Sequence, residues 1–219
     1  MATLAIISGG LREPSSTRLL ADRIDAAVRA ELARADISAT LSVVALRLLG
    51  RAIMDAMLTG FPSAELESAF DTVAGADGVI AVTPAFNASY SGLFKSFFDV
   101  LPEETLSDMP VLIAATGGTE RHSLVLEHAL RPMFSYLHAI VSPTGVYAAT
   151  DDFGTQHGSP LSARITKAAV DFTRLMQSCG ARHRRDTFTE DAATMEQLLT
   201  ATMDGGTWQD RADAGTVED

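Results

Sequence analysis

Short apolar runs alternate with segments of helical periodicity over most of the chain. Strands are predicted where the apolar residues are consecutive, and helices where they recur every three or four positions. Five strand–helix pairs in succession predict a parallel sheet with helices on both faces. The predicted strands are 3–8, 40–46, 77–84, 110–116 and 139–148, and the predicted helices are 16–34, 63–74, 91–101, 123–137 and 159–179.

The composition of the strands indicates their order in the sheet. The first, third and fourth runs are almost continuously apolar, as expected for strands that are covered on both faces. The second run carries Thr40 and Ser42 and the fifth carries Pro143, which suits edge strands. We therefore predict a flavodoxin-like three-layer α/β sandwich with a five-stranded parallel sheet in the order 2-1-3-4-5. In that order a ligand binds beyond the carboxyl ends of the first and third strands.

Length, charge and cysteine content limit the possible classes of protein. The chain has 219 residues, of which 47% are hydrophobic, and we predict a single domain over residues 1–203. Residues 204–219 hold five acidic residues against one arginine and are predicted to be a disordered tail. A net charge of −11 argues against binding to nucleic acid or to anionic membranes. The single cysteine excludes a disulfide framework and a cysteine-based zinc site.

Nothing in the sequence indicates a membrane span or a targeting segment. No run approaches the ~18 consecutive apolar residues that a membrane-spanning helix needs. The first predicted strand begins at residue 3, without a basic segment before it. We therefore expect a soluble, cytoplasmic protein.

The first loop (residues 8–17) is rich in glycine and in hydrogen-bond donors. Gly9 and Gly10 allow a tight turn, and the hydroxyl residues at 15–17 stand where the first helix begins. Their hydroxyls and the free amides of the first helical turn can converge on an anion, and Arg12 adds a charged donor. The loop lacks both GxxxxGK[ST] and GxGxxG, which excludes a triphosphate P-loop and the dinucleotide fingerprint. The alternative is that Ser15 or Ser16 only caps the helix.

The second loop (residues 83–91) follows the third strand. Pro84 ends that strand, and the small polar segment behind it can lie against a flat ring, with Phe86 or Tyr90 packed nearby. Both aromatic residues fit a core or an interface equally well. The helix that follows, 91–101, is apolar on almost every side, which predicts that a second subunit covers part of it.

The third loop (residues 115–123) follows the fourth strand. Gly117 and Gly118 again permit close approach of the backbone to a ligand. His122 and His128 have no acidic or cysteine partners at metal-ligand spacing, so no metal site is predicted. Pro132 removes a hydrogen bond to the carbonyl of His128, which predicts a kink or bulge in the fourth helix.

Together these stretches resemble the NAD(P)H-dependent FMN reductase family, which has a flavodoxin-like fold. The resemblance is strongest to the reductases that supply reduced FMN to two-component flavin monooxygenases of the alkanesulfonate and luciferase-like types. It covers residues 4–149, about two thirds of the chain. The matching stretches are SGGLREPSSTRLLADRI, TPAFNASYSGLFKSFFDVLPEETL and ATGGTERHSLVLEHALRPMFSYLHAIVSPTGVYA.

The resemblance implies that the first loop holds the FMN phosphate and that the other two loops flank the isoalloxazine ring. It also implies a π-type bulge in the fourth helix. Two positions depart from the family pattern, because GSxR has become GGLR and the tyrosine of TPxY has become Phe86. The implied FMN-binding residues are Gly10, Leu11, Arg12, Ser15, Ser16, Thr17, Pro84, Ala85, Phe86, Asn87, Ala88, Ser89, Tyr90, Thr116, Gly117 and Gly118.

The implied activity is hydride transfer from NADPH or NADH to FMN, with reduced flavin passed to a partner monooxygenase. The cofactor carries this chemistry, so no catalytic acid or base is expected. A homodimer or homotetramer is expected. Two alternatives stay open: a reductase of quinones, azo dyes or chromate that keeps FMN as a prosthetic group, and a flavodoxin-like electron carrier.

Overall fold

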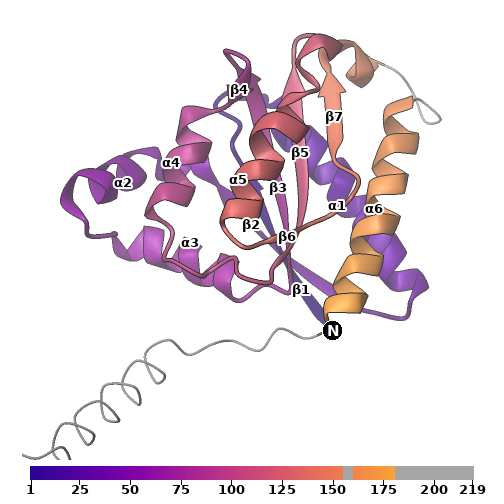
Figure 1. Cartoon of the computed structure of the whole chain (residues 1–219), viewed down its shortest axis with the longest axis horizontal. Coiled ribbons are helices and arrows are strands. Elements are labelled where there is room, and N and C mark those ends of the chain that lie inside the picture. Colours follow the sequence, from indigo (N-terminus) through magenta and orange to yellow (C-terminus); the bar gives the residue numbers. More distant parts are fainter. Residues whose placement is uncertain (155–159, 181–219) are drawn as a thin grey trace, which may run out of the picture. The chain divides into compact units, whose positions relative to one another are not determined.

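A computed structural model describes residues 1–154 and 160–180. Its centre is a parallel sheet in the order β2-β1-β3-β5-β6, and β7 also pairs with β5 (Figure 1). The predicted flavodoxin-like order is confirmed, with β6 and β7 in the place of the fifth strand. The bounds of these strands are β1 (Ala2–Ser8), β2 (Ala39–Ala45), β3 (Gly78–Phe86), β5 (Pro110–Gly117), β6 (Ile140–Val141) and β7 (Val146–Ala149).

Helices cover both faces of the sheet, as predicted. Alternate residues of β1 enter two separate cores: Leu4 and Ile6 lie in one, and Ala5 and Ile7 in the other. The first core packs against α1 (Ser16–Arg34) and α6 (Pro160–Cys179). The second packs against α2 (Leu46–Thr59), α3 (Ala64–Ala74), α4 (Gly92–Val100) and α5 (Arg131–Tyr136).

The prediction of one unbroken fifth strand is wrong. The chain pairs with β5 through β6, leaves the sheet at Ser142 and returns as β7 at Val146. Pro143 lies in this break, and Arg131 donates to the carbonyls of Ser142 and Pro143 at 3.0 and 3.2 Å. These bonds satisfy carbonyls that would otherwise pair within a sheet, so the interruption is a stable part of the fold.

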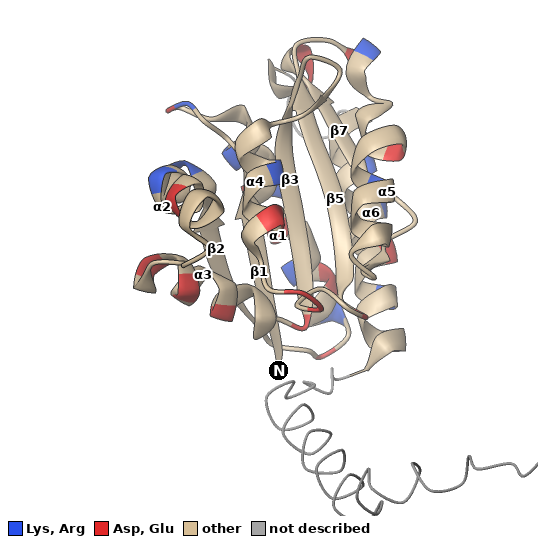
Figure 2. Cartoon of the chain, turned by 60° about the vertical axis from the view of Figure 1, so that its left-hand side comes forward, with Lys and Arg blue, Asp and Glu red and all other residues tan. Residues whose placement is uncertain are grey.

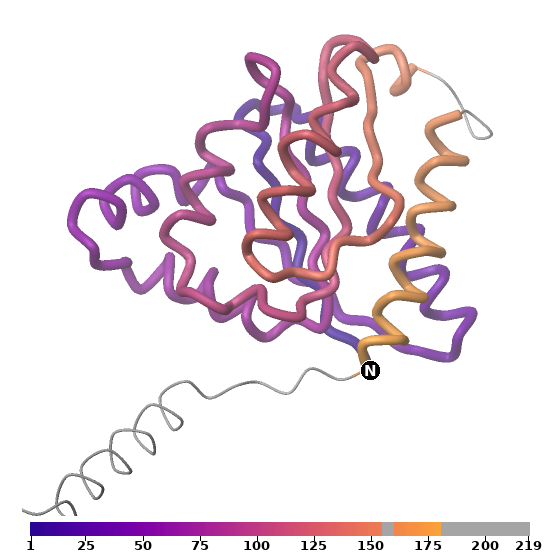
Figure 3. The backbone as a smooth tube through the Cα atoms, viewed as in Figure 1, coloured from indigo at the N-terminus to yellow at the C-terminus, as the bar shows by residue number. Residues whose placement is uncertain are grey.

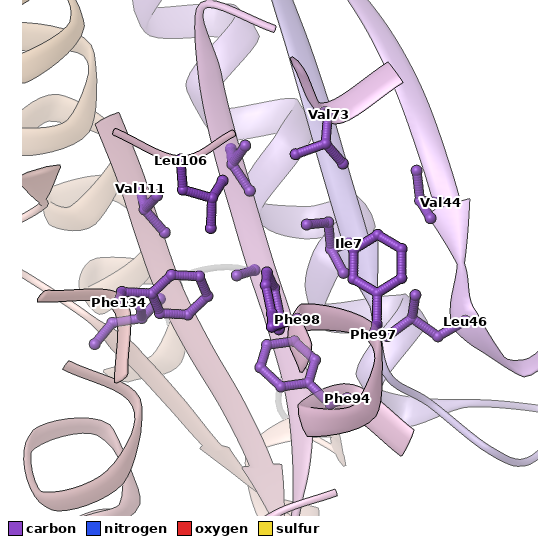
Figure 4. Packing of buried hydrophobic residues seen from close by; sticks show 14 of the residues in the cluster. Ile7, Val44, Leu46, Val73, Phe94, Phe97, Phe98, Leu106, Val111 and Phe134 are labelled. Carbon is purple, nitrogen blue, oxygen red and sulfur yellow. The ribbon is translucent and has the colours of Figure 1, made fainter. Parts of the chain in front are cut away.

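Helix α2 is absent from the sequence prediction. It packs against α4, and a Cβ on Gly50 would lie 3.7 Å from the side chain of Leu93. Phe94, Phe97 and Phe98 of α4 are buried, and Figure 4 shows Phe94 and Phe98 between Phe97 and Phe134. The apolar side chains of α4 that led to the expectation of a second subunit are thus largely covered within the chain, by the second core and by α2. A second subunit on α4 stays a prediction.

The fourth predicted helix contains a bulge, as expected from Pro132. Residues Leu126–Leu130 form a π-helical turn (η2), which leads directly into α5. The missing proline N–H removes an α-helical bond, and the wider turn accommodates that loss. Two short 3₁₀ turns, η1 (Glu120–His122) and η3 (Thr150–Gly154), stand at the ends of β5 and β7.

The predicted domain boundary at residue 203 and the predicted acidic tail, residues 204–219, lie outside the described residues. Within the described ranges, no helix combines the length and the apolar character needed to cross a membrane.

Candidate functional site

The loops that follow β1, β3 and β5 gather at one end of the sheet (Figure 3). The first and third loops are joined by a hydrogen bond between the hydroxyls of Thr17 and Thr116, at 2.9 Å. The third loop also contacts the second, because a Cβ on Gly117 would lie 3.6 Å from the Cβ of Ala85. Parallel strands end at the same edge of a sheet, so residues distant in sequence meet here.

The first loop ends in a capped helix N-terminus. The hydroxyl of Ser15 accepts a hydrogen bond from the amide of Arg18 at 3.1 Å, so Ser15 caps the helix. Among the described residues the amides of Ser16 and Thr17 have no hydrogen-bond partner. The Ser15 hydroxyl still has its own proton to donate. This helix start therefore offers amide and hydroxyl donors to an anion.

The bond between Thr17 and Thr116 limits what their side chains can offer a ligand. Both residues are buried, and their hydroxyls share one hydrogen bond. Since each hydroxyl has one proton, a single proton of the pair remains for another acceptor. The main contribution of this pair is to hold the first and third loops in register.

Charged side chains surround the exposed part of the first loop. Leu11 and Arg12 are exposed, and Glu13 forms an ion pair with Arg47 at 2.6 Å. Arg47 lies at the start of α2, and Figure 2 shows the basic positions on that helix. Sequence reasoning missed Arg47 because it missed α2. The apolar spacing of residues 46, 49, 53 and 56 was the available signal.

The second loop is a β-hairpin, and the prediction that Pro84 ends the third strand is wrong. β3 continues through Phe86 and pairs with β4 (Ser89–Tyr90) around a two-residue turn at Asn87 and Ala88. These two residues have φ values of 49° and 65°, as in a type I′ turn. The hairpin stands at the ligand end of the sheet in Figure 1.

The two aromatic residues of this hairpin have different surroundings. Phe86 is 43% exposed, so its ring is available to a ligand or to another protein surface. Tyr90 is half-buried, and its ring centroid lies 6.1 Å from that of Phe94. At the base of the hairpin, the amide of Ser91 donates to the buried hydroxyl of Thr83 at 3.1 Å. The hairpin is thus fixed at its base and exposed at its tip.

The third loop is held by a tyrosine that sequence reasoning did not select. Tyr147, on β7, donates from its phenol to the carbonyl of Thr119 at 2.7 Å. Burial raises the pKa of Tyr147, and the carboxylate of Asp152 raises it further, so the phenol is protonated at neutral pH. A Cβ on Gly117 would lie closer than 3.0 Å to the phenolic oxygen, whereas Gly118 has open space around it.

A hollow of about 450 Å³ lies beside the third loop. Its ionisable side chains are mainly acidic, with three carboxylates against Arg121. Such a lining repels a phosphate dianion, so the first loop is the better place for the phosphate. The lining residues are Thr119, Glu120, Arg121, Ala149, Asp151, Asp152 and Pro160.

The residues present fit a flavin mononucleotide. The donors at the start of α1 and the nearby arginine suit its phosphate. The close packing of Gly10 on Ser15 and of Gly117 on Tyr147 leaves no room for larger side chains at either turn. Gly118, next to the second of these turns, has open space where a Cβ would lie, so a ligand can approach its backbone closely.

Comparison with known proteins agrees with this fit. The sequence pattern of NADPH-dependent FMN reductases matches residues 2–154. The chain belongs to this family. An FMN reductase (NADPH) of Pseudomonas aeruginosa is 40% identical over 165 residues, which cover 74% of this chain and 86% of the relative. An NADH-dependent FMN reductase, SfnF, of Pseudomonas fluorescens is 41% identical over the same length and with the same shares covered.

A solved structure supports both the family and the fold. An oxidoreductase of Corynebacterium diphtheriae has 46% sequence identity and a TM-score of 0.78, with 81% of this chain and 98% of the other covered. The family resemblance of the three stretches is therefore confirmed. The assignment of individual FMN-binding residues stays a prediction.

Proposed function

We propose that this chain is an NAD(P)H-dependent FMN reductase that binds FMN across the three loops. The observation that carries the proposal is the hydrogen bond between Thr17 and Thr116. It joins a donor-rich helix start, suited to phosphate, to a glycine turn suited to close contact with a flat ring. Membership of the FMN reductase family supports the same ligand.

Each part of the site has a defined role in this proposal. The amides of Ser16 and Thr17, the hydroxyl of Ser15 and the guanidinium of Arg12 bind the phosphate. The hairpin, residues 84–90, and the turn at residues 116–118 lie on either side of the ring. FMN supplies the redox chemistry by accepting hydride from the nicotinamide, and the protein supplies alignment and exclusion of water.

The proposal treats FMN as a substrate that exchanges with solution. Leu11, Arg12 and Gly118 are exposed, which leaves the flavin partly open on the solvent side. We expect a dissociation constant of roughly micromolar order, about −8 kcal/mol, and a largely colourless purified protein. Delivery of reduced flavin to a monooxygenase, a cytoplasmic location and the choice between NADH and NADPH belong to the same proposal.

We also propose that the chain forms a homo-oligomer. With α4 covered inside the chain, the supporting observation is an apolar surface on α2. Met54, Met57 and Leu58 follow one another at helical spacing, and further exposed apolar side chains lie near the start of the helix and just past Gly60. The exposed residues are Leu48, Met54, Met57, Leu58 and Phe61.

Steady-state oxidation of NADH and NADPH, with free FMN, riboflavin or menadione as acceptor, tests the activity. We expect turnover with FMN and a lower KM for FMN than for riboflavin, because only FMN carries the phosphate. If the purified protein is yellow with tightly bound FMN and turns over menadione alone, the quinone reductase alternative is favoured. A monomeric protein that binds FMN but oxidises neither nucleotide would favour an electron carrier.

A pair of arginine variants separates the phosphate site from a general charge effect. Arg12→Ala should raise the KM for FMN about tenfold or more and leave that for riboflavin unchanged, because a charge-assisted bond to phosphate contributes about 1.5–3 kcal/mol. Arg34→Ala is the control, since Arg34 is exposed at the other end of α1. Equal effects of the two variants would contradict the assignment of Arg12.

A further inference from the structure

The third loop is fixed from two directions by residues outside it. On one side, the phenol of Tyr147 donates to the carbonyl of Thr119 at 2.7 Å. On the other side, Ala85 of the hairpin lies within van der Waals distance of the position where Gly117 would carry a Cβ. The turn therefore has little freedom to move toward or away from the space between the loops.

Gly117 and Tyr147 are matched in shape. A Cβ on Gly117 would lie closer than 3.0 Å to the phenolic oxygen and 3.1 Å from the ring carbon that bears it. Only a glycine leaves room for the hydroxyl group to pass the turn and bind the carbonyl two residues later. Tyr147 is 7% exposed, so its position is fixed by packing as well as by this hydrogen bond.

The pairing of β7 with β5 places this tyrosine. Tyr147 is paired with Ala115 and Ala149 with Gly117, so the end of β7 runs beside the start of the third loop. The ring extends from the sheet toward the turn, and Thr119 receives the only phenolic proton. Without that donor, the carbonyl of Thr119 has one partner fewer, and the turn can relax away from its present position.

We propose that Tyr147 is a positioning residue for flavin binding: its hydroxyl holds the turn Gly117–Thr119 at the distance at which its backbone contacts the isoalloxazine ring. This inference rests on the proposed function. It assigns to Tyr147 no contact with flavin and no role in the phosphate site.

Tyr147→Phe tests the proposal, because it removes the hydroxyl and keeps the ring. Fluorescence titration of the full chain with FMN and with riboflavin gives both dissociation constants. We expect both to rise by the same factor, about fivefold to tenfold, the size expected for one neutral hydrogen bond. The ratio of the two constants should stay at its wild-type value, since the phosphate site is unchanged. At saturating FMN, kcat should remain within about twofold of wild type while KM rises.

Two further variants complete the design. Tyr136→Phe is the matched control, since Tyr136 is 84% exposed, and both flavin constants should stay unchanged. Gly117→Ala displaces the phenol from the opposite side and should reproduce the parallel loss of FMN and riboflavin affinity. The absorption band of bound flavin should shift in both Tyr147→Phe and Gly117→Ala, because the groups around the ring have moved.

Several results would overturn the proposal. One is a fall in melting temperature of Tyr147→Phe with both flavin constants unchanged, which would make the residue purely structural. Another is a loss of FMN affinity without loss of riboflavin affinity, which would place the effect at the phosphate. If the wild-type chain binds neither flavin, the proposed function fails, and the role of Tyr147 fails with it.

Discussion

Substitution of Gly10 by alanine should damage the first loop through one identifiable contact. A Cβ at this position would lie closer than 3.0 Å to the hydroxyl of Ser15 and 3.1 Å from the Cβ of Thr17. The Ser15 hydroxyl caps α1 through the amide of Arg18. Because the hydroxyl sits on a rotatable side chain, it must rotate away from the new methyl group, and the cap is lost.

The size of the effect follows from the lost cap. Removal of an N-cap hydroxyl costs about 1 kcal/mol of unfolding free energy, which corresponds to a fall in Tm of about 2–4 °C for a domain of this size. In a Ser15→Ala background the hydroxyl is already absent, and only the contact with Thr17 remains. Gly10→Ala should therefore cost about 1 kcal/mol less in that background than in the wild type.

Urea unfolding of the wild type, both single variants and the double variant measures this coupling, and FMN titration of the same proteins measures the binding site. The dissociation constant for FMN should rise in both single variants, because each removes a donor from the phosphate site. Gly92→Ala serves as the control, since no heavy atom lies within 4 Å of the added Cβ. Stability effects of Gly10→Ala and Ser15→Ala that add to within about 0.3–0.5 kcal/mol would refute the reasoning.

Three more substitutions address other parts of the structure. Thr116→Val leaves the buried hydroxyl of Thr17 without its partner and should cost about 1–3 kcal/mol in urea unfolding, most of it regained when Thr17 is also changed to valine. Ala88→Gly should raise the free energy of unfolding by up to about 1 kcal/mol, and with it the urea midpoint, because Ala88 has a φ of 65°; a lower midpoint would contradict this. The pKa of Asp171 is lowered by hydrogen bonds from Thr144 and from a neighbouring lysine. The ionised carboxylate of Asp171 therefore stabilises the fold above the ordinary carboxyl pKa, and this stabilisation is lost as pH falls through the lowered pKa. Asp171→Asn should lower Tm at neutral pH and flatten the profile of Tm against pH below about pH 4; an unchanged profile would contradict it.

The parts of the fold that follow from burial were predictable from the sequence. Strands covered on both faces must be apolar throughout, and this, together with the polar residues and the proline of the two edge strands, gave the order of the sheet. Single residues were equally informative where their chemistry permits only one local structure, as for a helix-capping serine or a proline within a helix. Ser63 caps α3, and the missing amide of Pro132 accompanies a bulge in the helix before it. These elements depend on their own residues more than on distant partners.

Helix α2 was missed because its start and its interior carry weak signals. Ala45 precedes it without a capping side chain, and Gly50 interrupts its interior. Its stability comes from packing on α4, which no local pattern reveals. The apolar surface of α4 was assigned to a subunit contact for the same reason, since the helix that covers part of it had not been predicted.

The candidate site was predictable in its location and less so in its detail. The three loops were found because each follows a strand and is rich in small residues. The hairpin was not found, because its turn is Asn87–Ala88 and alanine rarely adopts a positive φ. Tyr147 gave no signal, since a tyrosine in a strand is an ordinary strand residue until its pairing is known.

The interruption between β6 and β7 decides which way Tyr147 faces. Three steps along β5, from Val111 to Ala114, correspond to five steps along the neighbouring chain, from Val141 to Val146. The neighbouring chain therefore has two extra residues, which is an even number. Because side chains alternate between the two sides of a strand, every residue after the detour points to the same side of the sheet as it would without the detour. A deletion of two residues here would keep the tyrosine on the side of Thr119. A deletion of one would turn it toward the opposite core and remove the phenolic donor from the carbonyl of Thr119.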